Sequence, residues 1–340
     1  MEFLRVTKDS NDLAKVLNIP KELFMKSVKT DYHIHPDYSP DASPASIRDY
    51  CCRAVELGLA EICFTTHVEL DPVRREVDNF VIVNGRRVSV FNPRWLDNYF
   101  TEISRAQREF KGAGLNVKAG VEVGYCPGTE KDIENITANH PFDYVLGAVH
   151  CINHVAISSR QESPHYFRHN SITELGRDYF GTLKEAVNTG LFDCIAHLDL
   201  YRRYGTKYYG SDVFTVHRGF IEPIFKEMAR RGMGLEINTS SRRRGLKEFH
   251  PCREIVALAA EAGIEIFTVG SDAHAPEQLG EHIGQALSLL AEFDLCNHVY
   301  TQRRAVPLFN GADGGHKVRN LHQAADAPQA EHRLYMGDYR

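Results

Sequence analysis

The sequence contains no long hydrophobic run, and no stretch of it approaches the roughly 20 apolar residues that a membrane-spanning helix needs. Its first residues lack the apolar core of a secretory signal. Positive charge is not in excess, because the formal net charge is −5, so nothing favours a nucleic acid or a phospholipid surface as a partner. The eight cysteines are scattered without a Cys-x-x-Cys pair, which indicates free thiols. We expect a cytoplasmic protein with neither membrane nor nucleic-acid partners.

Histidine, by contrast, is abundant, with 17 among 340 residues. His33 and His35 lie two apart at the end of a β-type run, and side chains at i and i+2 of a strand point to the same face. Asp41 follows in a turn rich in proline, serine and aspartate. This segment is typical of the first half of a metal site, although a pair of surface histidines would give the same local pattern.

The chain then alternates between short β-type runs and helical patterns. Seven such units predict an α/β domain of parallel strands, closed into a distorted TIM-like (β/α)7 barrel; a doubly wound open sheet is the alternative. We place this single domain at residues 28–309, with an insertion at about 71–94 that contains a β-hairpin around Asn84-Gly85. Residues 1–27 are predicted to be a helical lead-in, and residues 310–340 a poorly ordered tail.

Six of the seven β-type runs end in residues that can bind a metal ion. In a barrel of this kind the site lies at the carboxyl ends of the strands. The candidates there are His33, His35, His67, Glu122, His150, His197, Asp272 and His274. Any one of them could be an ordinary core or surface residue, but their equivalent placement predicts a shared metal site. Other histidines without such placement are assigned to the surface: His140, His154, His165, His169, His217, His250 and His298.

The mixture of imidazole and carboxylate, without thiolate, suits Zn²⁺, Mn²⁺ or Fe²⁺. With Asp41 the candidates number nine, too many for one ion. We therefore expect two or three divalent ions that share a carboxylate, an arrangement that activates a bridging water and stabilises a departing oxyanion.

These motifs resemble those of the PHP (polymerase and histidinol phosphatase) superfamily, from residue 30 to about residue 300. The matching pieces are Asp-Tyr-His33-Ile-His35, Asp41, Thr66-His67, Gly120-Val-Glu122-Val-Gly-Tyr-x-Pro-Gly, Phe142 to His150, Phe192 to Leu200, Leu235 to Ser240 and Gly270-Ser-Asp272-Ala-His274. The segment Gly120–Gly128 and the Phe142-Asp-Tyr block are similar to the histidinol-phosphatase branch. Many members of the superfamily have histidine where this chain has Asp41.

The resemblance implies a trinuclear centre in a distorted (β/α)7 barrel. Carried onto this sequence, the first metal takes His33, His35, Glu122 and Asp272. The second shares Glu122 and adds His150 and His197, and the third takes Asp41, His67 and His274. The implied catalytic group is Glu122, Asp272 and His274.

The activity implied by the resemblance is hydrolysis of L-histidinol phosphate to L-histidinol and phosphate, a step of histidine biosynthesis. A phosphate substrate favours guanidinium partners. The candidates for substrate binding lie in loops after strands: Arg160, Arg202, Arg203, Arg242, Arg243 and Asn238. In the loop Cys151–Asn170, Glu162 is the acidic residue available to the amine of that substrate.

Three alternatives remain at this point. The chain could hydrolyse another small phosphomonoester, such as a nucleotide or a sugar phosphate. A barrel amidohydrolase also begins with His-x-His, but many such enzymes place a bridging lysine where this chain has Glu122. A non-catalytic metal-binding module is the third, although no ligand position is missing. The sequence does not predict the oligomeric state.

Overall fold

A computed structural model describes residues 29–308, so the predicted lead-in (1–27) and the predicted tail (310–340) lie outside the described residues. Its centre is a nine-stranded sheet in the order β1-β2-β5-β6-β9-β10-β11-β12-β13. Neighbouring strands are parallel except for β12 and β13. The strands are β1 (Thr30–Ile34), β2 (Glu61–Glu69), β5 (Asn116–Gly124), β6 (Tyr144–Ala148), β9 (Cys194–Ile195), β10 (Gly234–Asn238), β11 (Phe267–Gly270), β12 (Asn297–Thr301) and β13 (Arg304–Leu308).

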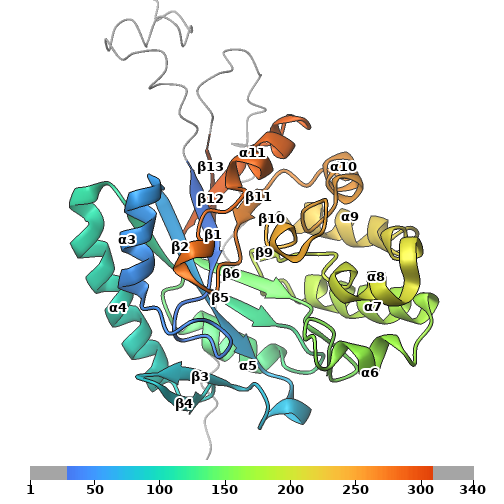
Figure 1. Cartoon of the computed structure of the whole chain (residues 1–340), viewed down its shortest axis with the longest axis horizontal. Helices are drawn as coiled ribbons and strands as arrows, with labels where there is room; N and C mark the ends of the chain where they lie inside the picture. The colour runs from blue at the N-terminus through green and yellow to red at the C-terminus, as the bar shows by residue number, and fades with distance from the viewer. Residues whose placement is uncertain (1–28, 309–340) are drawn as a thin grey trace, which may run out of the picture. The chain divides into compact units, whose positions relative to one another are not determined.

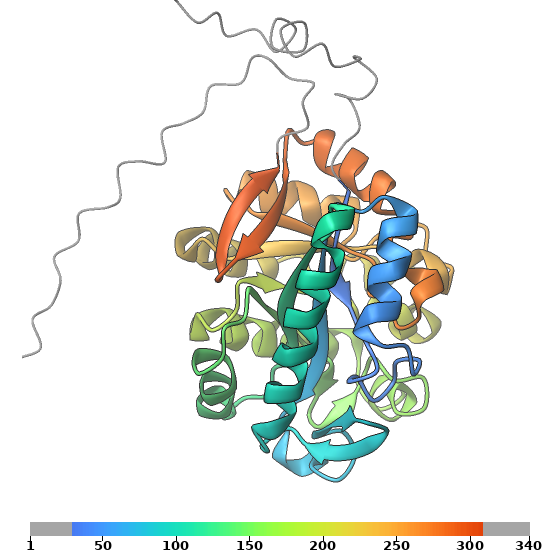
Figure 2. The same cartoon turned by 90° about the vertical axis from the view of Figure 1, so that its left-hand side faces the viewer.

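Helices connect successive strands and cover the sheet, with α3 and α4 side by side in both views (Figures 1 and 2). The α-helices are α3 (Ile47–Leu57), α4 (Arg94–Phe110), α5 (Glu130–Ala138), α6 (Ser163–Phe167), α7 (Ile172–Thr189), α8 (Arg202–Tyr209), α9 (Ile221–Arg231), α10 (Arg253–Glu261) and α11 (Ile283–Ala291). Short 3-10 helices are η1 (Pro72–Arg74), η2 (Lys111–Ala113), η3 (Gly210–Phe214), η4 (Arg242–Arg244) and η5 (Pro276–Gln278). In the part of the chain that the structure describes, no helix has the length and apolar character needed to span a bilayer.

Local sequence sets the ends of the crossover helices. Ser46 caps α3 and Asp49 returns the hydrogen bond to the Ser46 backbone, so that two otherwise unpaired amides are satisfied. Gly58 ends the same helix in the left-handed region, at φ 66°, where a side chain would be strained. Ser171 and Glu174 form the same capping box on α7. These ends fix where each crossover returns to the sheet.

The segment after β2 forms a separate small unit of structure. It begins with η1 and continues as the antiparallel hairpin β3 (Phe80–Val83) and β4 (Arg86–Ser89). Asn84 and Gly85 make the turn with φ of 51° and 72°, both positive as a type I′ turn requires. A second short hairpin, β7 (Cys151–Ile152) and β8 (Val155–Ala156), follows β6.

The first and seventh parallel strands approach each other beyond the continuous ladder. One parallel bridge joins Ile34 to Ala273. The His35 amide donates to the Ala273 carbonyl at 2.8 Å, and the Ala273 amide donates to the His33 carbonyl at 3.2 Å. The predicted α/β fold with a mostly parallel sheet is confirmed. Full closure is not, because the pairings among residues 29–308 include no continuous ladder between β1 and β11.

Candidate active site

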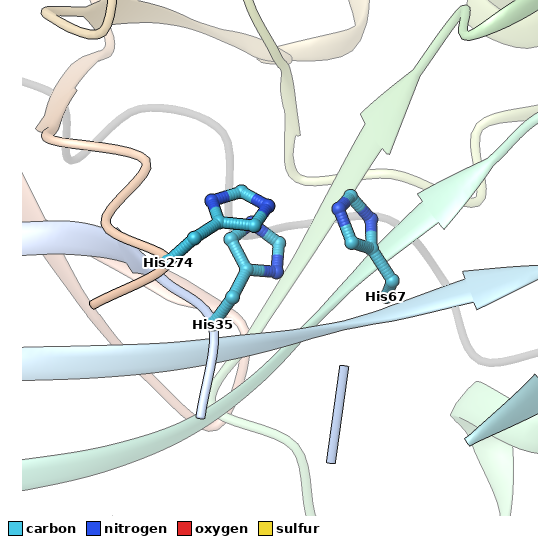
Figure 3. Close-up of side chains that lie close together, drawn as sticks. All are labelled: His35, His67 and His274. Atoms are coloured by element: carbon cyan, nitrogen blue, oxygen red, sulfur yellow. The ribbon is translucent and has the colours of Figure 1, made fainter. Parts of the chain in front are cut away.

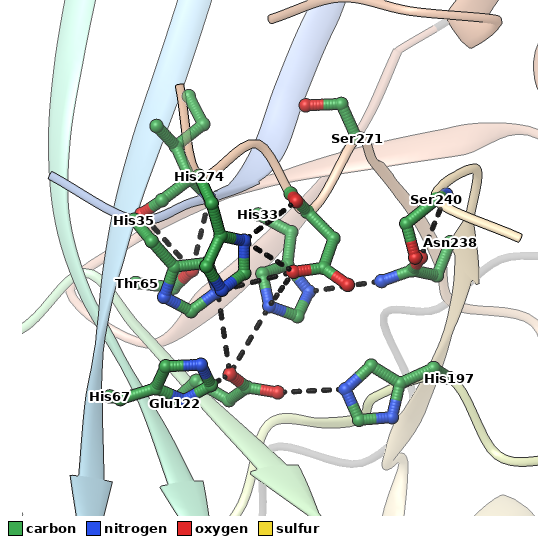
Figure 4. Close-up of polar contacts among 12 residues, drawn as sticks. His33, His35, Thr65, His67, Glu122, His197, Asn238, Ser240, Ser271 and His274 are labelled. Carbon is green, nitrogen blue, oxygen red and sulfur yellow. Dashed lines mark hydrogen bonds and ion pairs between the residues drawn. The ribbon is translucent and has the colours of Figure 1, made fainter. Parts of the chain in front are cut away.

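Glu122 lies at the centre of a group of imidazoles at the carboxyl edge of the sheet. Its side chain is fully buried on β5, directly opposite His67 in the ladder with β2. Five ring nitrogens surround its two oxygens. Figure 4 shows the rings of His33, His35, His67 and His197 around it. Oε2 lies 2.8 Å from His67 Nδ1, 3.3 Å from His33 Nε2 and 3.5 Å from His35 Nε2, and Oε1 lies 2.9 Å from His197 Nε2 and 3.3 Å from His150 Nε2. One carboxylate therefore joins ligand candidates from four strands and the loops that follow them.

Two further carboxylates extend this group toward the surface. Asp272 Oδ1 lies 3.4 Å from His35 Nε2 and 3.3 Å from His274 Nδ1. Asp41 lies 3.3 Å from His274 Nε2 and 3.7 Å from His67 Nε2. The structure thus brings together all nine residues that the sequence analysis proposed as metal ligands.

The imidazole rings of His35, His67 and His274 lie close together, as Figure 3 shows; the His35 ring is stacked with that of His67 and tilted by 33° from that of His274. The ring centroids are 4.0 Å apart for His35 and His67 and 4.2 Å apart for His35 and His274. Several buried atoms in the group have no hydrogen-bond partner within residues 29–308, among them His33 Nε2, His35 Nε2 and Glu122 Oε2. Buried polar atoms are rarely left unsatisfied, and converging imidazole and carboxylate atoms are suitable for metal ions. The residues present fit a centre of more than one divalent cation.

Metal-binding geometry is repeated within the group. Three sets of ligand atoms lie within 4.8 Å of one another: His35, His67 and His274; His33, His35 and Asp272; and His33, Glu122 and His197. A fourth set of this kind contains His67, His150 and Glu69. His33, His35 and His67 each belong to two of these sets, and neighbouring metal ions in a cluster share ligands in this way.

Two carboxylates that the sequence analysis missed hold the imidazoles in orientation. Glu236 on β10 lies 2.6 Å from His33 Nδ1 and accepts the His197 amide at 2.9 Å. Glu69 lies 2.6 Å from His150 Nδ1. With Nδ1 engaged in this way, Nε2 of His33 and of His150 faces Glu122, which is the arrangement that a ligating histidine needs. A carboxylate within the apolar run of β10, and one two residues after His67, were the signals in the sequence.

Charge is balanced within the group by protons on some of its imidazoles. Burial alone would raise the pKa of Glu122, but His33, His67 and His150 hold that pKa well below its usual range. Burial works against protonation of His67, but Glu122 and Asp41 raise its pKa to about 9. His35 has its pKa lowered by burial and by His67 and His274. A bound cation would replace the protons that neutralise these carboxylates.

A cavity of about 820 Å³ opens over this group. His67, His150, His197, Asp272 and His274 line its floor, whereas Glu122 lies beneath them. Five guanidinium groups line it as well: Arg74, Arg160, Arg203, Arg243 and Arg244. Acidic side chains border another part of the cavity, namely Glu69, Asp78 and Glu162. Its volume is that of a site for a small molecule, and arginines beside a metal-type floor suit a phosphate group.

A family model, that of the PHP domain, matches residues 31–240. The chain belongs to the PHP domain family. The predicted membership is thereby confirmed.

Curated relatives of this PHP protein extend over most of the chain. A probable histidinol-phosphatase of Deinococcus radiodurans is 29% identical over 289 residues, which cover 82% of this chain and 98% of the relative. The histidinol-phosphatase of Lactococcus lactis is 30% identical over 212 residues, which cover 62% of this chain and 71% of that protein.

Solved structures share the fold. The histidinol phosphate phosphatase of Lactococcus lactis, crystallised with zinc, L-histidinol and phosphate, superimposes with a TM-score of 0.66 at 23% identity, over 82% of this chain and 99% of that one. A putative histidinol phosphatase of Listeria monocytogenes gives a TM-score of 0.62 at 18% identity, over 76% and 99%. At these identities the likeness shows the α/β fold.

The structure separates the predicted substrate residues of this PHP protein into two groups. Arg160, Arg203 and Arg243 line the cavity, whereas Arg202, Arg242 and Asn238 are not among its lining residues. Arg202 is buried and donates to Asp199 at 2.6 Å. Arg242 instead donates to the Lys247 carbonyl and lies over the Phe249 ring.

Asn238 supports the site from behind. Its side chain is fully buried and donates to Glu236 Oε2 at 3.1 Å, so it helps to position the carboxylate that holds His33.

The surface assignment of His217, His250 and His298 was wrong, because all three are buried. His250 Nδ1 lies 2.5 Å from Asp199 Oδ1, a partner that the sequence pattern did not reveal.

Proposed function

We propose that this PHP protein is a phosphoric monoester hydrolase that converts L-histidinol phosphate to L-histidinol and phosphate in histidine biosynthesis. The observation that carries the proposal is the cavity, where a floor of imidazoles and carboxylates meets a cluster of arginines. Relatives named histidinol-phosphatase over most of the chain support the choice of substrate. We also propose that the sheet is a distorted (β/α)7 barrel, in which the bridge from Ile34 to Ala273 brings the first and last ligand pairs together.

The centre holds two or three divalent ions, Zn²⁺, Mn²⁺ or Fe²⁺, in this proposal. His33, His35, Glu122 and Asp272 hold the first; Glu122, His150 and His197 hold the second; Asp41, His67 and His274 hold the third. Bound ions supply an activated water as nucleophile and withdraw charge from the phosphate oxygens. Glu122, Asp272 and His274 are the proposed catalytic group.

The protein's own side chains position the phosphate. Arg160, Arg203 and Arg244 line the cavity, and guanidinium groups fit phosphate oxygens in pairs. Arg203 Nε is buried and has no hydrogen-bond partner in the described part of the chain, so it is available to an anion. Arg243 has another task, because its Nη2 donates to the carbonyls of Ser271 and Asp272, each at 2.8 Å. It thereby fixes the backbone that carries Asp272, which has a φ of 54°.

The amine of the substrate is met by Asp78 in this proposal. Glu162, which the sequence analysis expected to bind the amine, instead forms a two-point ion pair with Arg74, at 2.5 and 3.0 Å. Asp78 lines the same cavity; its Oδ2 accepts from Arg74 Nε at 2.8 Å, but its Oδ1 has no hydrogen-bond partner among the described residues. Burial and the neighbouring Glu69 raise the pKa of Asp78 to about 6, and a cationic amine beside it would relieve that repulsion.

The test is phosphate release from L-histidinol phosphate and from a panel of nucleoside monophosphates and sugar phosphates, at fixed Zn²⁺ or Mn²⁺. We expect kcat/KM for L-histidinol phosphate to exceed that for the panel by about 100-fold. Equal rates on all compounds would refute the substrate, and a higher rate on a panel member would identify another phosphomonoester as the substrate.

Asp78→Asn tests the amine contact. We expect it to lower kcat/KM for L-histidinol phosphate about tenfold, the loss of one charged hydrogen bond, and to leave the panel compounds unaffected. Asp97→Asn, an exposed aspartate on α4, is the matched control. A loss of equal size on every phosphomonoester would assign Asp78 to the support of the site instead.

A further inference from the structure

A second group of possible metal ligands lies apart from the nine residues of the proposed centre. Asp71, Cys126 and His154 each place one ligand atom within 4.8 Å of the other two. Asp71 follows β2, Cys126 follows β5, and His154 lies in the turn between β7 and β8. Three segments distant in sequence therefore meet beside the cavity through three different side-chain types.

The electrostatics of this group favour a cation. Both oxygens of Asp71, a nearly buried residue, lie close to His154 Nδ1, at 2.9 and 2.8 Å. Burial and the carboxylates of Asp71 and Glu69 raise the pKa of the Cys126 thiol to about 11. A thiol in these surroundings is protonated at neutral pH and is a poor nucleophile. A bound divalent ion would compensate the two carboxylates and stabilise the thiolate.

The backbone holds His154 in a conformation that directs its ring at Asp71. Asn153 and His154 have φ of 50° and 63°, the left-handed region in which the second turn position is commonly glycine. Arg74 Nη1 also donates to the His154 carbonyl at 3.1 Å. The position of His154 is therefore fixed by its side chain, which contacts Asp71, and by its carbonyl, which accepts from Arg74.

We propose that Asp71, Cys126 and His154 bind one Zn²⁺ ion that is separate from the proposed catalytic centre. Thiolate, imidazole and carboxylate are the ligands that zinc takes in proteins, and a water completes a tetrahedral site. Binding releases the thiol proton and leaves the imidazole neutral, with its hydrogen on Nε2 and its Nδ1 on the metal. The proposal does not depend on which phosphomonoester the protein hydrolyses.

The role of this ion is to connect the walls of the cavity. Asp71 begins the segment that carries Arg74 and Asp78, and Arg74 binds Glu162 in the loop after β8. An ion held by Asp71 and His154 would fix these two segments to each other and, through Cys126, to the end of β5. It would stabilise the cavity without taking part in the reaction.

Cobalt provides a selective test, because a thiolate bound to Co²⁺ gives a charge-transfer band in the near ultraviolet. None of the nine residues of the proposed centre is a cysteine, so in the full-length protein a band that depends on Cys126 would report the second site. We expect the band in the Co²⁺-loaded protein and its loss in Cys126→Ser, together with one Zn²⁺ fewer per chain by elemental analysis. Cys52→Ser, a partly buried cysteine on α3, should keep both the band and the zinc content.

His154→Gln is the second variant, chosen because its side chain is 49% exposed and so is not needed for the core. We expect it to keep the cobalt band but to require about tenfold or more Co²⁺ for half-saturation. Three outcomes would overturn the proposal: no band in the Co²⁺-loaded protein, a band that survives Cys126→Ser, or His154→Gln binding cobalt as tightly as the unsubstituted chain.

Discussion

Replacing Glu122 by glutamine tests both the site and its electrostatics. The substitution keeps the shape of the side chain and removes its charge from among five imidazoles. The closest is His67, whose Nδ1 lies 2.8 Å from Oε2 and whose pKa is raised from 6.5 to about 9. A shift of this size corresponds to about 3 kcal/mol of interaction with the protonated ring, which is in the range for breaking a buried ion pair.

The sign of the pH dependence follows from the raised pKa of His67. Its contribution to the free energy of unfolding is fully present below pH 6.5, the unfolded value, and is lost as the pH rises through about 9. Because Asp41 contributes to the same shift, Glu122→Gln in the metal-free protein should lower the free energy of unfolding by at most about 3 kcal/mol at pH 6 and by much less at pH 10. Urea titrations in the presence of a chelator measure both differences.

The same substitution should remove the shared ligand of the proposed ions. We expect metal content to fall by at least one ion per chain and phosphate release to fall about 1000-fold, equivalent to roughly 4 kcal/mol. Glu109→Gln is the control, because its ion pair with Arg48 is exposed to solvent and contributes little to stability. Normal metal content and activity in Glu122→Gln, or a stability loss independent of pH, would refute the reasoning.

Three further predictions concern charge in and around the site. Arg202→Met should lower the free energy of unfolding by about 3 kcal/mol, since it leaves buried Asp199 without its arginine, and it should leave KM unchanged. Because the pKa of Asp199 is lowered in the folded protein, this loss of stability should be present above pH 3.8 and diminish in acid. Urea titrations at several pH values measure it. Apparent Zn²⁺ affinity, measured by chelator competition, should fall about tenfold per pH unit below pH 9 as protons compete for His67. Arg244→Met should raise KM about tenfold in initial-rate assays, with little change in kcat.

The placement of the ligand candidates could be predicted because it depends on topology alone. Carboxyl ends of parallel strands meet at one edge, so residues as distant as His33 and His274 had to lie near each other once the units were recognised. The i, i+2 spacing of His33 and His35 directs both rings to Glu122, as expected. For this part of the site, strand order and side-chain periodicity contain the necessary information.

The remaining residues depend on features that periodicity does not encode. Arg202 and Arg203 are neighbours at the start of α8, yet one is buried against Asp199 and the other lines the cavity. Which of the two arginines is buried depends on the tertiary contact with Asp199 and not on the local sequence pattern. His250 is similar, because its side chain is buried against Asp199 while its backbone pairs with Asn238 at the end of β10, contacts between segments that are distant in the sequence.

Two glycines explain how the imidazoles obtain their carboxylate supports within a close-packed sheet. Gly124 ends β5, and a Cβ atom there would collide with the side chain of Glu69. Gly270 ends β11, and a Cβ atom there would collide with His33 and with Glu236. Neither glycine has a positive φ, so space rather than backbone freedom requires them. Each absent side chain leaves room for a carboxylate that orients a histidine, which makes these strand ends part of the site although they provide no ligand.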